Sequence, residues 1–191
     1  MNLLAHLHLS AGLSPEETAG NVLADFLPYN LNPPEDIGRG IAIHRKIDSF
    51  TDSHPLVAEA RDLISKPRRR LASIIVDIAF DYTLSQKWEV HCDTALPEFI
   101  EDGYCIIQFG ARDLGESASR LIRRMRYYRW FESYSTVEGM GLTFRRMTRR
   151  SDAVKKLAGS EEEIVENLPQ LQALFDQFYP ELAKVVKGML P

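Results

Sequence analysis

The stretch RRRLASIIVDIAFDYTLSQKWEV, residues 68–90, limits the folds open to this chain more than any other segment. It is strongly apolar and contains neither glycine nor proline, and a helix that is apolar on nearly every side lies inside a protein core. Asp77 and Asp81 are four residues apart in it, so they share one helical face. A buried carboxylate without a partner protonates, pairs with a cation or binds a metal. The segment therefore predicts a central helix whose two acids have something cationic beside them.

Start and stop signals for helices recur along the rest of the chain. In SPEETAGNVLADFL, residues 14–27, Ser14 is a favoured N-cap and Pro15 takes the first helical position. The next predicted helix, PEDIGRGIAIHRKIDSF, ends before His54-Pro55, because the residue before a proline avoids helical geometry. Further helices are predicted over PLVAEARDLIS and over residues 96–112, 115–132, 136–150 and 160–189. With no alternating strand pattern in the sequence, we predict one all-α domain over residues 1–191, a helical bundle of roughly seven to eight helices.

Composition narrows the class of protein. The length of 191 residues suits one domain, and 45% hydrophobic with 26% charged residues argues against disorder. A net charge of −4 disfavours a general nucleic-acid binder. Cys92 and Cys105 have no metal-binding spacing and are expected as free thiols in a reducing compartment. The sequence lacks a basic leader and an apolar run of about 20 residues, so we predict a cytoplasmic protein without a membrane span.

Histidines and aspartates recur in apolar surroundings within the first 81 residues. In HRKIDSFTDSHP, His44 and Asp48 stand one helical turn apart, and Asp25 lies in the apolar GNVLADF. His6 and His8 alternate with leucines in AHLHL. Histidine and carboxylate ligands suit Mn²⁺, Mg²⁺, Fe²⁺ or Zn²⁺, and the absence of cysteine ligands argues against a closed structural zinc site. An oxygen-rich site with open positions is what metal-assisted phosphoester hydrolysis requires.

Each of these residues also has a structural interpretation. His8 is as readily a hydrogen-bonded core residue, and Asp25 could bond the start of a neighbouring helix. Asp77 or Asp81 could pair with Arg45 in a buried salt bridge. Acids and polar residues are ordinary at a helix end, which favours a structural role for Asp52 and His54. The combination of five or six such groups on apolar helices is what favours a metal site.

Four motifs, MNLLAHLHLS, GNVLADF, GIAIHRKIDSFTDSHP and DIAFDYTLSQKW, resemble those of the bacterial acyl carrier protein phosphodiesterase family in order and spacing. The resemblance extends to FDQFYPEL near the C-terminus and is looser over residues 91–165. It implies an HD-like helical phosphohydrolase of lipid metabolism and fatty acid biosynthesis. The implied reaction cleaves the phosphodiester between 4'-phosphopantetheine and the serine of holo-acyl carrier protein, giving the apo-protein.

The same resemblance implies a set of site residues. Carried over by motif, the metal ligands are Asp25, His44, Asp48 and Asp81, and manganese is the expected ion, with Mg²⁺ or Fe²⁺ as alternatives. His6 and Asp77 are alternatives as ligands or as catalytic neighbours, and Arg45 is expected to stabilise charge that develops on the phosphate. An aspartate or His6 would take the proton from the attacking water. Tyr82 departs from the pattern, since relatives often have histidine there.

A basic stretch suggests a partner. Residues 112–150 hold ten arginines and four acids, a local charge of +6, and RLIRRMRYYRWF interleaves arginine with aromatic residues. Acyl carrier proteins are small and acidic, so this stretch would steer and dock them. The predicted partner-binding residues are Arg120, Arg123, Arg124, Arg126 and Arg129.

Other interpretations of the stretch and of the site remain. The arginine stretch could instead be a solvated helix face or part of an RNA-binding or protein-interaction module without catalysis. The histidine and aspartate residues could instead belong to an HD-type nucleotide phosphohydrolase. Nucleic acid is the less favoured partner, and the sequence has no glycine-rich phosphate loop that would support a nucleotide triphosphatase.

Overall fold

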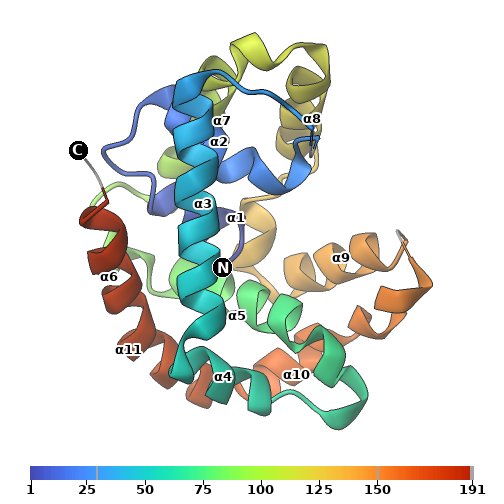
Figure 1. Ribbon diagram of the computed structural model, residues 1–191. Helices are drawn as coiled ribbons and strands as arrows, with labels where there is room; N and C mark the ends of the chain where they lie inside the picture. The colour runs from blue at the N-terminus through green and yellow to red at the C-terminus, as the bar shows by residue number, and fades with distance from the viewer. Residues whose placement is uncertain (29, 150, 190–191) are drawn as a thin grey trace.

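A computed structural model describes residues 1–28, 30–149 and 151–189. Within these ranges the fold is all-α with no strand, which confirms the predicted class (Figure 1). The α-helices are α1 (Leu3–His8), α2 (Pro15–Leu23), α3 (Glu35–Ser53), α4 (Pro55–Asp62), α5 (Ala72–Gln86), α6 (Trp88–His91), α7 (Leu96–Gly110), α8 (Glu116–Tyr127), α9 (Val137–Thr148), α10 (Ser160–Glu166) and α11 (Leu168–Lys187). Short 3₁₀ helices are η1 (Ala24–Phe26), η2 (Lys66–Leu71), η3 (Arg112–Leu114), η4 (Glu132–Ser135) and η5 (Asp152–Leu157).

The eleven α-helices of the described residues exceed the predicted seven to eight for local reasons. The segment predicted as one helix over 160–189 divides at Asn167, because Pro169 has no N–H to continue the first helix. The stretch over residues 68–90 divides into η2, α5 and α6. The helix predicted to reach Leu27 ends at Leu23 and continues as η1.

The central helix is α5, as its composition predicts. Ile75, Val76, Ile78 and Phe80 are fully buried and belong to one hydrophobic cluster with residues from α1 through α11. Helices α1, α4, α10 and α11 contact α5. Of its two aspartates, Asp81 is fully buried, whereas the side chain of Asp77 is 27% exposed.

Helix α1 is an element that the sequence analysis did not predict. It has six residues, too few for a periodic pattern or for stability outside a protein. Its first amide groups, which have no partner within the helix, donate to the Asp81 carboxylate from Leu4 at 2.7 Å and from Asn2 at 3.2 Å. The N-terminus thereby lies near the middle of the molecule beside α3 (Figure 1).

Helices α2 and α3 pack with their backbones in direct contact. A Cβ at Gly20 would lie 2.2 Å from the Ile37 carbonyl oxygen, and one at Gly40 would lie 2.0 Å from the Glu17 carbonyl oxygen. Only glycine allows this approach. The contact brings the Asn21 carbonyl of α2 to the His44 ring of α3.

The start of α2 follows the predicted signal. Ser14 accepts from the Glu17 amide at 3.1 Å, and the Glu17 carboxylate accepts from the Ser14 amide at 2.9 Å, with Pro15 at the first position. No helix in the described ranges combines the length and apolar character that a membrane span requires.

Candidate metal centre

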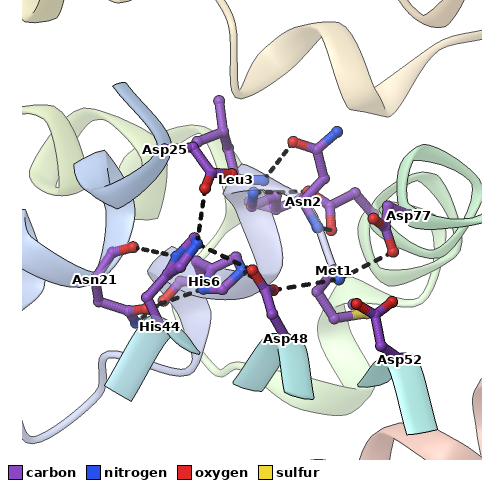
Figure 2. A network of polar contacts seen from close by, with 12 residues as sticks. Met1, Asn2, Leu3, His6, Asn21, Asp25, His44, Asp48, Asp52 and Asp77 are labelled. Atoms are coloured by element: carbon purple, nitrogen blue, oxygen red, sulfur yellow. Dashed lines mark hydrogen bonds and ion pairs between the residues drawn. The ribbon is translucent and has the colours of Figure 1, made fainter. Parts of the chain in front are cut away.

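Three elements bring two histidines and two aspartates together (Figure 2). His6 lies on α1, His44 and Asp48 lie on α3, and Asp25 lies on η1. Asp48 contacts both rings, with Oδ1 3.2 Å from Nε2 of His6 and Oδ2 3.0 Å from Nε2 of His44. Asp25 Oδ1 lies 3.2 Å from the same His44 nitrogen. Ligand atoms of His6, His44 and Asp48 all fall within 4.8 Å of one another.

The two rings are buried, and the carboxylates reach the surface. The His6 and His44 rings stack with centroids 4.2 Å apart. Their residues are 2% and 5% exposed, whereas the Asp25 side chain is 74% exposed. The group is therefore built into the protein on the histidine side and open to a ligand on the Asp25 side.

Hydrogen bonds on the far side of the rings orient both histidines. Nδ1 of His44 lies 2.8 Å from the Asn21 main-chain oxygen, and Nδ1 of His6 lies 2.9 Å from the Asn21 side-chain oxygen. Figure 2 shows Asn21 on one side of the rings and Asp25 and Asp48 on the other. Each Nε2 atom therefore faces carboxylate oxygens.

The pKa values of His6, His44 and Asp48 depend on one another, because their side chains are in contact. Burial opposes protonation of His44, but the hydrogen bonds that its ring donates to Asp25 and Asp48 outweigh this effect and raise its pKa to about 9. Burial lowers the pKa of His6, so this ring is neutral at pH 7. Although burial acts against the charged form of Asp48, its hydrogen bond with His44 and the nearby Met1 ammonium hold its pKa well below the usual range.

A divalent cation fits this arrangement. Neutral His6 uses its proton at Nδ1 to reach Asn21, so its Nε2 lone pair faces Asp48 Oδ1 across 3.2 Å. Two acceptors at that distance repel each other unless a proton or a metal ion lies between them. Neutral imidazole nitrogens and carboxylate oxygens are ligands for Mn²⁺, Fe²⁺ and Zn²⁺.

The two aspartates of α5 have separate partners. Asp77 Oδ1 accepts from the Met1 ammonium at 3.0 Å, and that ammonium lies 3.9 Å from Asp48 Oδ1. Both oxygens of Asp81 accept main-chain amides of α1. Burial raises the pKa of Asp81 to about 7, against the opposing effects of Met1 and these amides. Neither acid pairs with Arg45, so that alternative is wrong.

Of the predicted site residues, His6, Asp25, His44 and Asp48 come together, and Asp77 joins them through the Met1 ammonium. Asp81 lies behind them, and its role as a ligand stays a prediction. Arg45 is exposed and lines a cavity of about 430 Å³ together with Asp25.

Residues interpreted as structural have structural partners. His8 contacts the Tyr179 hydroxyl at 2.7 Å and the His91 carbonyl at 3.1 Å. His54 caps α4 through the Leu56 amide. Asp52 pairs with Arg61. The buried side chain of Tyr82 belongs to the core cluster.

The predicted partner-binding arginines divide into two sets. Arg123, Arg126 and Arg129 pair with acids of the same chain, Glu116, Glu101 and Glu132 respectively. Arg120 and Arg124 form no ion pair with any described residue. Arg124 and Arg146 instead lie over the Tyr128 ring at 5.9 and 5.1 Å.

Two polar groups that contact the candidate site were not predicted from the sequence. Asn21 stands within GNVLADF, four residues before Asp25, and is fully buried. A polar residue on the same helical face as a predicted ligand was a usable signal. The contact of the Met1 ammonium with Asp77 could not be predicted from the sequence, because only the docking of α1 brings the two groups together.

Comparison with known proteins identifies similar chains. The profile of the family described as Acyl carrier protein phosphodiesterase matches residues 1–182. A protein of that name from Yersinia enterocolitica serotype O:8 / biotype 1B is 37% identical over 189 residues, which cover 95% of each chain. Others of that name, from Photorhabdus laumondii and Pectobacterium atrosepticum, are 37% and 34% identical; the matches cover 94% and 98% of this chain and 92% and 98% of theirs. No solved structure gives a significant match.

Proposed function

The chain belongs to the acyl carrier protein phosphodiesterase family, and on this premise we propose that it hydrolyses holo-acyl carrier protein with the help of a divalent metal ion. The bond cleaved joins 4'-phosphopantetheine to a serine of the carrier protein, and apo-acyl carrier protein is the product. The observation that carries the metal dependence is the grouping of His6, His44 and Asp48, whose ligand atoms lie within 4.8 Å of one another, with His6 Nε2 3.2 Å from Asp48 Oδ1. Manganese is the ion we expect, as in HD-type phosphohydrolases, and Mg²⁺ or Fe²⁺ has the same charge.

Asp25, His44 and Asp48 would hold the ion, and Asp81 is the fourth proposed ligand. The ion supplies Lewis-acid chemistry, lowering the pKa of water and offsetting negative charge on the phosphate. Arg45 stands on the cavity wall beside Asp25, where its guanidinium can bind a phosphate oxygen. Asp25 marks the open side of the group, so the phosphodiester would enter there.

His6 and Asp77 are the proposed proton acceptors. The His6 Nε2 lone pair faces into the site and can take a proton from water or bind the ion, but not both. The Asp77 carboxylate is 27% exposed and next to Asp48 through the Met1 ammonium. The Mn²⁺ content of His6→Ala separates the two roles of His6: a ligand loses metal, whereas a proton acceptor keeps it.

The arginine surface is the proposed docking site for the acidic carrier protein. Arg120 and Arg124 are exposed without an acidic partner in the described chain, and Tyr127 is 80% exposed next to them. Arginine and tyrosine together are typical of protein interfaces. Arg123, Arg126 and Arg129 already have acidic partners and contribute less net charge.

Three features support a cytoplasmic enzyme rather than the alternatives. Cys92 and Cys105 are free thiols, as expected in a reducing compartment. The ion pairs of three arginines leave less free positive charge for RNA. Two buried histidines beside carboxylates favour a hydrolase over a module that only binds.

The deciding experiment presents purified protein with holo-acyl carrier protein and with a nucleotide panel, after chelation and after Mn²⁺ is added back. We expect apo-acyl carrier protein and free phosphopantetheine only with metal. A control with Asp48→Ala should be inactive under all conditions. Full activity in strong chelator would refute metal dependence, and turnover of nucleotides alone would favour the HD-type nucleotide phosphohydrolase.

A further inference from the structure

We propose that Asn21 is the positioning residue of the metal centre. One buried residue accepts the Nδ1 proton of both histidines and so directs both Nε2 atoms toward the ion. The identity of the ion rests on the proposed function, whereas the arrangement of protons does not.

His44 is fixed by the main chain. Its Nδ1 lies 2.8 Å from the Asn21 carbonyl oxygen, and a carbonyl can only accept a hydrogen bond. Nδ1 of His44 therefore donates. The distance depends on the close packing of α2 on α3 at Gly20 and Gly40, so no side-chain substitution at Asn21 removes this acceptor.

His6 is fixed by the side chain. The Asn21 amide nitrogen donates to the His6 carbonyl oxygen at 3.0 Å and to the Ser10 hydroxyl at 2.9 Å. Because the His6 carbonyl can only accept, this end of the amide must be the NH₂ group. The other end, Oδ1, then faces Nδ1 of His6 at 2.9 Å and must accept from it.

The amide itself has one possible orientation. Asn21 is fully buried, and Ser10 donates to the His6 carbonyl at 2.9 Å while it accepts from Asn21. A flipped amide would place two acceptors, its own oxygen and the His6 carbonyl oxygen, against each other. A partner that holds the second ring nitrogen of a ligand typically raises metal affinity about 10- to 100-fold.

The experiment measures the proton position directly and the metal separately. Nitrogen-15 NMR of the metal-free protein, with His6 assigned through His6→Gln, should show a neutral His6 ring protonated at Nδ1. Asn21→Ala removes the acceptor, so the His6 ring should populate both tautomers, and the dissociation constant for Mn²⁺ alone should rise about 10- to 100-fold. His44 keeps its main-chain acceptor in this variant.

Two further variants separate positioning from packing. Asn21→Asp keeps an acceptor for Nδ1 but loses the donor to Ser10 and to the His6 carbonyl, so it should be less stable and still hold the Nδ1 tautomer. Ser10→Ala removes a neighbouring hydrogen bond and should likewise lower the melting temperature without changing the tautomer. If Asn21→Ala does not fold, the His6 tautomer in Asn21→Asp and Ser10→Ala still tests the proposal.

The proposal is overturned if wild-type His6 is protonated at Nε2, if Asn21→Ala keeps both the tautomer and the Mn²⁺ affinity, or if Asn21→Asp changes the tautomer. A folded wild type with the expected tautomer that does not cleave holo-acyl carrier protein would refute the proposed function and leave this inference standing.

Discussion

The candidate metal centre and the arginine surface both gather charged side chains, and they differ in what surrounds those charges. The arginine surface consists of Arg120, Arg123, Arg124, Arg126 and Arg129, which lie on α8 and just after it. At the metal centre, His6 and His44 are buried, and each ring nitrogen has a defined partner. On the arginine surface, side chains such as Arg123 and Arg129 are 60% and 76% exposed. Water can replace a lost partner on the surface but not in the core.

The consequence is a difference in how the two regions respond to mutation. Residues of the buried group share partners, so removing one disables the others. Surface charges act through a field that salt screens over about 10 Å, so their effects are small and nearly additive. Each of the following measurements tests this contrast, in order of decreasing expected effect.

The largest effect is expected from His44→Ala and Asp48→Ala. Asp48 contacts both His6 and His44, so each single change should lower kcat/KM more than about 1000-fold and remove bound Mn²⁺. The double variant should lose little more, because the two residues act as one unit. Kinetics and metal analysis of the three variants measure this. Additive losses in the double variant would show that the two residues act independently.

Asp81→Asn should affect stability as well as activity. Both Asp81 oxygens accept main-chain amides of α1, and an asparagine would turn one of them into a donor facing a donor. An unsatisfied buried group of this kind costs about 1 to 3 kcal/mol of unfolding free energy. Denaturant unfolding and Mn²⁺ titration of the folded variant measure both effects. Unchanged stability with complete loss of Mn²⁺ would instead make Asp81 a direct ligand without a role in anchoring α1.

The pKa of His44 predicts a pH dependence of the metal-free protein. Its pKa in the fold is about 9, against an ordinary value of 6.5, because Asp25 and Asp48 favour the charged ring. The folded protein therefore holds this proton more tightly than the unfolded chain. The resulting stability is fully present below about pH 6.5 and is lost as the pH rises through about 9.

Mn²⁺ must displace the same proton, so its affinity should rise with pH up to about 9. Melting temperatures and Mn²⁺ titrations across this range measure both trends, with His44→Gln as the control that should flatten the stability curve. A metal affinity that falls with pH would contradict the assignment of His44 as a ligand.

Local sequence patterns predicted which residues of the candidate site lie together better than they predicted the contacts among them. Apolar periodicity and helix signals identify α2, α3 and α5, and the spacing of His44 and Asp48 places them on one face. The short α1 lies beyond such patterns, because tertiary contacts with Asp81 hold it in place. The role of the Asn21 carbonyl depends on the packing of α2 against α3, which local periodicity does not describe.

Reversal of surface arginines should have a moderate effect that depends on their partners. Arg120→Glu with Arg124→Glu should raise KM for holo-acyl carrier protein about 10-fold and leave kcat and Mn²⁺ content unchanged, since docking charges act mainly on association. The matched control, Arg123→Glu with Arg126→Glu, changes the same net charge at arginines that pair with Glu116 and Glu101.

We expect a smaller rise in KM for the control pair and weaker binding of the wild type at high salt. If neither charge reversal nor salt changes the rate of hydrolysis of holo-acyl carrier protein, this surface does not dock the carrier protein. Equal effects of the two pairs would mean that net charge, rather than unpaired arginine, attracts the partner.

The smallest effect is expected from Asp52→Asn, one helical turn beyond Asp48 on α3. Asp52 is rotated about 80° around the helix from His44, and its carboxylate pairs with Arg61 at 2.5 Å with 68% of its side chain exposed. Figure 2 shows it apart from the two rings. Asp52→Asn should keep its metal and most of its activity, whereas Asp48→Asn loses both, because Asp48 contacts Nε2 of both histidines. Metal analysis of the two matched variants makes the comparison on one helix. If Asp52→Asn lost Mn²⁺ while Asp48→Asn kept it, the ligand would be Asp52, and the boundary between buried site and exposed charge would lie one turn further along α3.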